Sequence, residues 1–189
     1  MSRALVERYG INVPRYTSYP TAPHFQDAVQ GPAYRDWLAA LVPTTPLSLY
    51  FHVPFCAEMC SFCGCHTKIV RRYDPIARYL KTLEAEIDLV AAALPGKFQA
   101  AFVHWGGGSP TMLRGDDWRR MHDHLRRTFA FGPAAEIAVE LDPRTATKDY
   151  VQALAAAGVN RVSLGVQDFD SAVQTSVKRV QSEEETRRI

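Results

Sequence analysis

The residues best suited to chemistry are three cysteines at the spacing C-x3-C-x2-C, Cys56, Cys60 and Cys63. They follow directly after a strand-like run at 48–53. Three thiolates this close together can each hold one iron of a cubane iron–sulfur cluster, whereas a cluster that only stores electrons has four protein ligands. The spacing therefore predicts a cluster with one iron free to bind another molecule.

A fourth cysteine, Cys65, leaves zinc as an alternative interpretation, because four sulfurs would satisfy a tetrahedral zinc ion. Structural zinc sites usually take their ligands as two separated pairs, so that the metal ties two chain segments together. All four cysteines here lie between positions 56 and 65, which favours the iron–sulfur cluster. Cys65 is then interpreted as a thiol beside the cluster or the substrate, or as a small hydrophobic residue.

The composition restricts the classes of function to be considered. The chain has 189 residues, 47% hydrophobic and 22% charged, as in globular domains. A net charge of +2 gives no argument for nucleic acid or membrane binding, no apolar run could span a bilayer, and the first residues do not resemble a signal peptide. Clustered thiols in such a chain indicate a metal site in a reducing compartment, and we expect the cytoplasm.

Strands and helices alternate from residue 48 onward. We expect strands at 48–53, 100–105, 136–141 and 161–166, helices at 75–94, 115–129 and 147–157, and the start of a further helix at 170–180. This alternation predicts βαβ units with a parallel sheet. The fold class is therefore expected to be α/β, a partial (β/α) TIM-like barrel of about four βα units.

The chain is expected to divide into an N-terminal arm at 1–47 and an incomplete barrel at 48–189. The arm contains the segment PRYTSYP at 14–20 and a short helical pattern around 34–41, and its composition alone favours a rigid, extended linker. The last residues, 181–189, show no terminating element. We expect the N-terminal part of a longer protein, without the later strands and a C-terminal domain, and inactive by itself.

Further candidates for a site follow the second and third expected strands. A glycine run, Gly106 to Gly108, allows close approach of a ligand to the backbone, although such a run is also a common turn. Glu140 needs polar partners if it is buried, and is otherwise a solvated strand end. Lys68, Arg71 and Arg72 could hold substrate carboxylates, or form a solvated entrance to the next helix.

Taken together, these motifs resemble the radical S-adenosylmethionine (SAM) enzymes and, within them, the oxygen-independent coproporphyrinogen III oxidase family. The resemblance rests on PRYTSYPTA at 14–22, LSLYFHVPFC at 47–56, CSFCGC at 60–65, HWGGGSPT at 104–111, VELDPR at 139–144 and RVSLGVQDF at 161–169. PRYTSYP and Cys65 favour the oxidases over the related heme chaperones. Ser109 stands where threonine is more usual in the family.

The resemblance implies a radical SAM barrel in which Cys56, Cys60 and Cys63 ligate a [4Fe–4S] cluster and SAM chelates the open iron. Tyr50, Gly106 and Glu140 match family positions that contact this first SAM. The family binds a second SAM, and the positions that match residues near it are Phe62, Gly107, Gly108, Gln167 and Arg179. The PRYTSYP segment resembles an arm that folds over the site, which weakens the linker interpretation.

The implied activity is the oxidative decarboxylation of coproporphyrinogen III to protoporphyrinogen IX in heme and porphyrin biosynthesis, through a 5′-deoxyadenosyl radical formed from SAM. The implied partners are this small-molecule substrate and an electron donor for the cluster, and the protein is expected to be a monomer. Two alternatives stay open, a radical-SAM-like heme chaperone and a structural zinc module.

Overall fold

The computed structural model describes residues 3–10 and 21–189. The PRYTSYP segment lies outside the described residues, so its role as an arm over the site stays a prediction. The chain divides into two compact units, one reaching to Tyr34 and the other running from Arg35 to Ile189. The expected boundary between arm and barrel, after residue 47, likewise stays a prediction.

The first unit is largely exposed where it is described. Helix α1 (Arg3–Tyr9), which the sequence analysis did not expect, carries an ion pair between Arg3 and Glu7 with an N–O distance of 2.9 Å. A pair this exposed adds little stability. A short 3-10 helix, η1 (Ala22–His24), follows, and α2 (Gly31–Ala39) begins before the boundary between the units.

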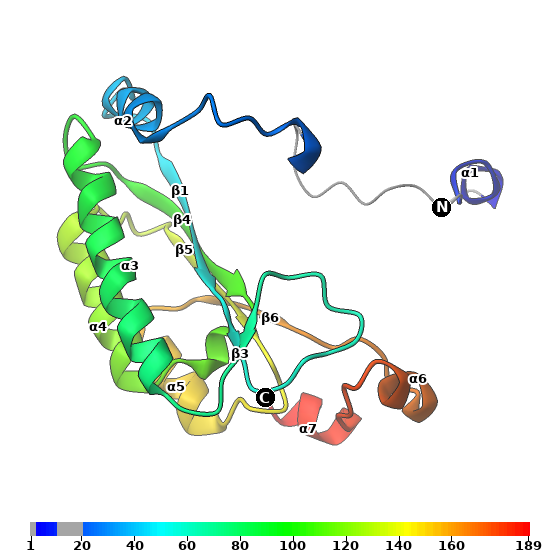
Figure 1. The fold of residues 1–189 in the computed structure, drawn as a ribbon. Helices are drawn as coiled ribbons and strands as arrows, with labels where there is room; N and C mark the ends of the chain where they lie inside the picture. The colour runs from blue at the N-terminus through cyan, green and yellow to red at the C-terminus, as the bar shows by residue number, and fades with distance from the viewer. Residues whose placement is uncertain (1–2, 11–20) are drawn as a thin grey trace. The chain divides into compact units, whose positions relative to one another are not determined.

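A four-stranded parallel sheet forms the centre of the second unit (Figure 1), and its strands pair in chain order. The strands are β1 (Leu47–Val53), β4 (Ala100–Gly107), β5 (Glu136–Leu141) and β6 (Arg161–Leu164). The predicted parallel α/β arrangement is confirmed. β6 ends two residues earlier than expected, because the Val166 N–H donates to the Leu164 carbonyl at 3.0 Å and the chain turns at Gly165.

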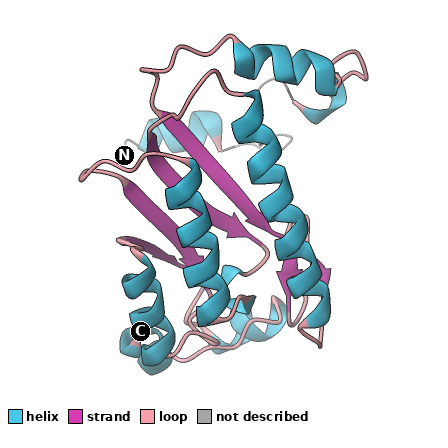
Figure 2. Ribbon diagram, turned by 90° about the vertical axis from the view of Figure 1, so that its left-hand side faces the viewer, coloured by secondary structure: helices cyan, strands magenta, loops and turns pink. Residues whose placement is uncertain are grey.

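Three helices cover one face of the sheet, as Figure 2 shows: α3 (Asp74–Ala93), α4 (Gly115–Thr128) and α5 (Lys148–Ala157). The expected helical spacing places Ile76, Leu80 and Leu83 of α3 in the core. Helix α5 begins at the N-cap Thr147, whose hydroxyl accepts the Tyr150 N–H, and ends at Gly158 with φ +99°. This left-handed glycine after the helix is the expected terminator.

The core lies between the sheet and these helices. Trp105 of β4 stacks on Phe51 of β1 with ring centroids 4.5 Å apart, and meets the edge of Trp118 from α4 at 4.9 Å. Trp105 and Trp118 are fully buried. Because side chains alternate along a strand, the residues next to these in sequence point to the other face of the sheet, which these helices leave uncovered.

Short elements surround the carboxyl ends of the strands. β2 (Phe55–Cys56) pairs with β3 (Lys68–Ile69), and η2 (Pro110–Met112), α6 (Ser171–Ser176) and α7 (Glu183–Arg188) complete the chain. The sequence analysis assigned no helix within 181–189, where the structure has α7. Ser182 and Glu185 form a capping box that starts α7.

A buried histidine of α4 makes stability depend on pH. Burial lowers the pKa of His122 to about 4, and the Arg126 guanidinium acts in the same direction. His122 stacks on Trp105, and its Nε2 has no hydrogen-bond partner among the described residues. The unfolded chain, with a histidine pKa of 6.5, therefore binds a proton that the folded chain does not.

We expect the free energy of unfolding to fall as the pH drops from about 6.5 toward about 4. Urea titrations at several pH values measure this slope, with His122→Gln as the comparison. The slope over this range should flatten in the variant, whatever its overall stability. An unchanged slope would contradict the assignment to His122.

Candidate active site

The cysteines lie in a loop whose two ends are held together. β2 and β3 place Cys56 opposite Ile69, and the Val70 N–H donates to the Cys56 carbonyl at 3.0 Å. The loop between these strands carries Cys60 and Cys63 and follows the carboxyl end of β1. In barrels of parallel strands this end carries the active site.

Each of the three predicted cluster ligands accepts a hydrogen bond at sulfur from a different donor. The Thr67 hydroxyl donates to Cys56 Sγ at 3.3 Å, the Cys65 N–H to Cys63 Sγ at 3.4 Å, and an Arg179 Nη to Cys60 Sγ at 3.9 Å. Hydrogen bonds to cysteine sulfurs are one of the means by which proteins set the potential of an iron–sulfur cluster. The loop therefore holds three sulfurs in polarised surroundings.

The chemistry of this donor set fits a cationic metal centre. Burial raises the pKa of the Cys56 thiol, the Thr67 hydroxyl opposes this shift, and the Cys63 and Cys60 sulfurs raise the pKa further. Three thiolates this close repel one another unless metal ions neutralise them, so metal binding would release their protons. Cys65 is exposed, and its contact with Cys63 Sγ is made by its backbone N–H.

Within residues 3–10 and 21–189, no three His, Cys, Asp or Glu side chains converge on a point where they could hold a single metal ion. A zinc ion needs such convergence, since all its ligands bind one centre. A cubane cluster, in contrast, distributes its cysteines over different irons.

Tyr50, His104 and Glu140 lie side by side on the uncovered face of the sheet. The Tyr50 and His104 rings stack with centroids 5.8 Å apart, and His104 Nε2 lies 3.1 Å from Glu140 Oε1. A Cβ on Gly106 would be 3.0 Å from the Glu140 carboxyl carbon, so a side chain at this position would press on the carboxylate. Three predicted contacts of the first SAM, Tyr50, Gly106 and Glu140, are thus neighbours.

The other two glycines of the run pack against the cluster loop and the end of β1. Gly107 has φ +111°, and a Cβ there would lie 2.9 Å from the His52 ring. His52 Nε2 is 2.7 Å from the His66 carbonyl oxygen and Nδ1 is 3.1 Å from Tyr50 Oη. Because a carbonyl only accepts, Nε2 carries the proton and Nδ1 accepts from the Tyr50 hydroxyl.

Substitution of Gly108 by alanine should disturb the cluster loop. The added Cβ would lie 2.5 Å from Thr67 Oγ1 and 2.7 Å from the Phe55 carbonyl oxygen. Because backbone cannot yield as a side-chain tip can, we expect a loss of about 1–3 kcal/mol in the free energy of unfolding. Chemical denaturation measures it. Gly96→Ala is the control, since nothing lies within 4 Å of its Cβ, and an equal loss in both variants would contradict the prediction.

A buried network joins the last part of the chain to the cluster loop. Asp142, at the end of β5, pairs with Arg144 at 2.7 Å and with Arg179 at 3.3 Å. Burial raises the pKa of Asp142, but the Arg144 hydrogen bond and the charges of both arginines outweigh this effect, so the pKa lies below its ordinary value. Arg179 also donates to the Gly165 carbonyl at 2.7 Å.

The residues expected around a second SAM are more dispersed. Phe62 is 46% exposed in the cluster loop, and Gln167 is exposed after β6. The contacts of Gly107 and Gly108 are with His52, Thr67 and Phe55, while those of Arg179 are with Asp142, Gly165 and Cys60. The structure therefore brings these five residues to the same end of the sheet without joining them into one cluster.

Sequence reasoning assigned no role to His52, His104, Thr67 or Asp142. Alternation along the strands could have identified the two histidines. His52 follows Tyr50 by two positions and His104 precedes Gly106 by two, so each shares a face of the sheet with a predicted site residue. Thr67 and Asp142 carry no such signal, because their contacts are made across loops.

Comparison with known proteins agrees with this geometry. The family model for the radical SAM superfamily matches residues 50–189. The chain therefore belongs to the radical SAM superfamily. Membership implies a [4Fe–4S] cluster and SAM as cofactors, and it fits the partial barrel seen here.

The similar curated proteins include oxygen-independent coproporphyrinogen III oxidases. That of Bradyrhizobium diazoefficiens is 51% identical over 92% of this chain and 39% of its own length, and that of Escherichia coli is 43% identical over 96% and 39%. A solved structure of coproporphyrinogen III oxidase from Escherichia coli, described as a radical SAM enzyme, has a TM-score of 0.85 and 40% identity, covering 97% of this chain and 40% of that one. The chain spans about 40% of the length of the curated relatives it matches.

None of the helices in the described part of the chain is both long and apolar enough to cross a membrane.

Proposed function

We propose that the protein to which this chain belongs catalyses the oxygen-independent oxidative decarboxylation of coproporphyrinogen III to protoporphyrinogen IX, a step of heme and porphyrin biosynthesis. One observation carries the proposal. The likeness to the Escherichia coli oxidase structure covers 97% of the chain, whereas the superfamily model begins only at residue 50. The likeness to the oxidase thus extends into a part of the chain that the superfamily model does not match. The activity is proposed for a protein of the relatives' length.

Cys56, Cys60 and Cys63 would hold the cluster, with SAM on the open iron. Together these groups supply, when bound, a 5′-deoxyadenosyl radical that can remove hydrogen from a propionate side chain of the substrate. The part of this chain is to bind, orient and exclude water. Glu140 would bind the cofactor amine, and Tyr50 and Gly106 would border it.

His104 supports this role of Glu140 by contact. Its Nε2 is within hydrogen-bond distance of the Glu140 carboxylate, and its ring is stacked on Tyr50. A carboxylate oriented in this way presents its remaining lone pairs to a ligand amine, and a charge-assisted hydrogen bond is stronger than a neutral one.

We further propose the second SAM of the family beside Phe62, Gly107, Gly108, Gln167 and Arg179. Gly107 is the last residue of β4 and Gly108 follows it, Phe62 lies in the cluster loop, Gln167 follows β6, and Arg179 follows α6. The division into an arm at 1–47 and a barrel at 48–189, the cytoplasmic location, the monomeric state and the use of an external electron donor belong to the same proposal.

An anaerobic assay tests the function. The cluster-loaded protein, SAM and a chemical reductant are mixed with coproporphyrinogen III, and mass spectrometry follows the conversion of propionate to vinyl groups. Formation of protoporphyrinogen IX together with 5′-deoxyadenosine is expected. Heme binding without any vinyl product would instead support a chaperone, and a colourless protein that contains zinc would support a structural module.

A further inference from the structure

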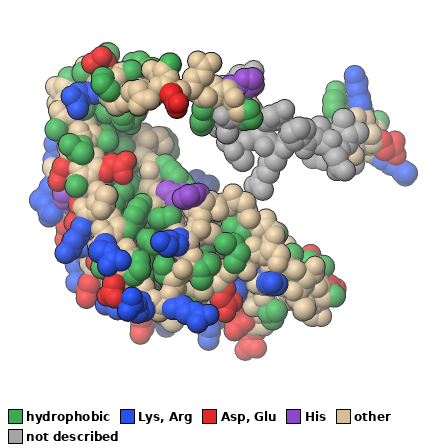
Figure 3. All heavy atoms as spheres, viewed as in Figure 1, with side chains coloured by type: hydrophobic (Ala, Val, Ile, Leu, Met, Phe, Trp, Pro, Cys, Tyr) green, Lys and Arg blue, Asp and Glu red, His purple; other side chains and the backbone are tan. Residues whose placement is uncertain are grey.

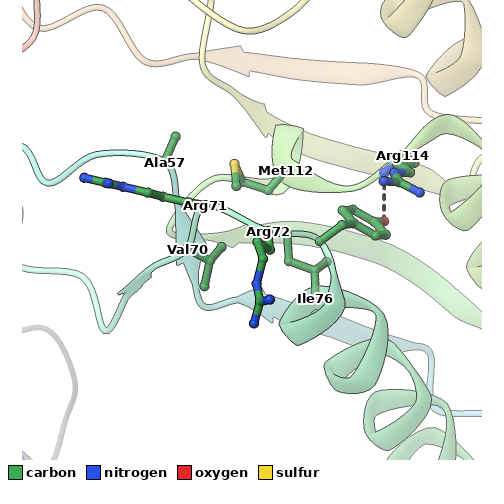
Figure 4. Close-up of a pocket in the computed structure, with 8 residues that line it drawn as sticks. Ala57, Val70, Arg71, Arg72, Ile76, Met112 and Arg114 are labelled. Atoms are coloured by element: carbon green, nitrogen blue, oxygen red, sulfur yellow. Dashed lines mark hydrogen bonds between the residues drawn. The ribbon is translucent and has the colours of Figure 1, made fainter.

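A basic pocket adjoins the cluster loop. Arg71, Arg72 and Arg114 line it over an apolar floor of Val70, Ile76 and Met112, and its volume is about 470 Å³ (Figure 4). We call it the arginine pocket. Its walls come from the segment leading into α3 and from the segment that joins η2 to α4.

The charges of the arginine pocket are available to a partner. All three arginines are exposed, and none forms an ion pair with another described residue. The carboxylate of Asp117 is already bound by Arg120 at 2.9 Å and by the Tyr73 hydroxyl. The Arg114 guanidinium lies 3.9 Å above the centre of the Tyr73 ring.

The pocket shares its backbone with a cluster ligand. Ala57, which also lines the pocket, follows Cys56 directly in the chain. In the floor of the pocket, the Val70 N–H donates to the Cys56 carbonyl at 3.0 Å. A molecule seated on the arginines would therefore contact the residue next to the Cys56 ligand and the residue that follows the paired strand β3.

None of the residues assigned to SAM lines the pocket. Tyr50, His104 and Glu140 occupy the uncovered face of the sheet, whereas the arginine pocket lies where the chain enters α3 and α4, the helices of the other face. Figure 3 shows Lys and Arg side chains, with some acidic ones among them, along the lower left of the molecule, where Figure 1 places the lower parts of these helices. A partner bound on this pocket would use none of the three residues Tyr50, His104 and Glu140.

We propose that the arginine pocket is the docking surface for an acidic protein that delivers single electrons to the cluster, an inference that rests on the proposed function. In each encounter the reduced carrier loses one electron and the cluster passes from [4Fe–4S]2+ to [4Fe–4S]+, with no bond formed or broken. Complementary charge steers such encounters and raises association rates by about 10- to 1000-fold at low salt.

The test uses the cluster-loaded protein and a reduced plant-type [2Fe–2S] ferredoxin with an acidic surface as the probe. Rapid-freeze EPR follows loss of the ferredoxin signal and gain of the [4Fe–4S]+ signal. In the double variant Arg71→Glu/Arg72→Glu, the second-order rate should fall about 10- to 100-fold at low salt. The difference should shrink as salt screens the charges. Equal rates in both proteins, or equal salt dependence, would overturn the proposal.

Calorimetric titration with the oxidised ferredoxin gives a readout that does not depend on redox potentials. The wild type should bind and the variant should bind at least tenfold more weakly, and equal affinities would also overturn the proposal. The matched control is Lys97→Glu/Arg127→Glu, which makes the same change of charge at exposed positions near the amino ends of β4 and β5. It should behave as wild type.

Failure of this inference is separable from failure of the proposed function. Dithionite, which needs no docking surface, should reduce the cluster equally in all variants. Suppose that dithionite supports the formation of vinyl products, and that the double variant accepts electrons from ferredoxin as fast as the wild type does. This result would refute the docking surface and leave the proposed function standing. Charge-dependent reduction of the cluster without any vinyl product would refute the decarboxylase alone.

Discussion

Substitution of Cys63 by serine should abolish cluster binding. A neutral hydroxyl is a poor iron ligand beside a thiolate, and two remaining cysteines would leave two irons without protein ligands. We expect iron in the anaerobically reconstituted protein to fall from about four per chain to near zero, with loss of the brown colour. Iron analysis and the visible spectrum measure this change.

Cys65→Ser is the matched control, two residues away in the same loop. The thiol of Cys65 is exposed, and its backbone N–H, which serine retains, makes the contact with Cys63 Sγ. This variant should keep its iron and its spectrum. Loss of metal in both variants would instead indicate a site with four cysteine ligands, as the zinc interpretation requires.

Substitution of Glu140 by glutamine should weaken SAM binding to the cluster-loaded protein about 10- to 100-fold. The exchange keeps the shape of the side chain and removes its charge, and hydrogen bonds to charged groups contribute about 1.5–3 kcal/mol. Equilibrium dialysis with labelled SAM measures the dissociation constant, and the visible spectrum confirms that the cluster is present in each sample.

Glu136→Gln is the control on the same strand. Glu136 lies four positions earlier, at the start of β5, and forms an ion pair with Arg161 at 2.8 Å. Glu136 lies at the amino end of β5, whereas Gly106 lies at the carboxyl end of β4. The Glu136→Gln variant should therefore leave the affinity for SAM unchanged. If both variants lost affinity equally, net charge and not the position of Glu140 would explain the effect.

The sequence determined the framework of this site well because the signals are local. Helical spacing on α3 and α4 identified the buried faces, and Gly158 marked the end of α5. The cysteine loop, the glycine run and Glu140 could be placed at one end of the sheet, since all follow parallel strands. The capping box of Ser182 and Glu185 is an equally local signal.

The contacts that polarise the cluster ligands could not be predicted in this way. Arg179 reaches Cys60 because the chain turns at Lys178, a non-glycine residue with φ +55°, directly after α6. No periodic pattern encodes where such a turn directs the next side chain. The direction taken by Arg71 and Arg72 likewise depends on how the segment after β3 runs into α3.

The contact between Arg179 and Cys60 also has a consequence for the order of assembly. It joins residues 119 positions apart, and the neighbouring Ser61 N–H donates to the Val177 carbonyl at 3.0 Å. β1 and β6 are the opposite edges of the sheet, so these bonds form a bridge between its first and last strands. Contacts of such long sequence separation carry a large loop-closure entropy and slow folding. We therefore expect the donor to Cys60 to come into place after the sheet has formed through β6, so that the complete set of polarised sulfurs is a late product of folding.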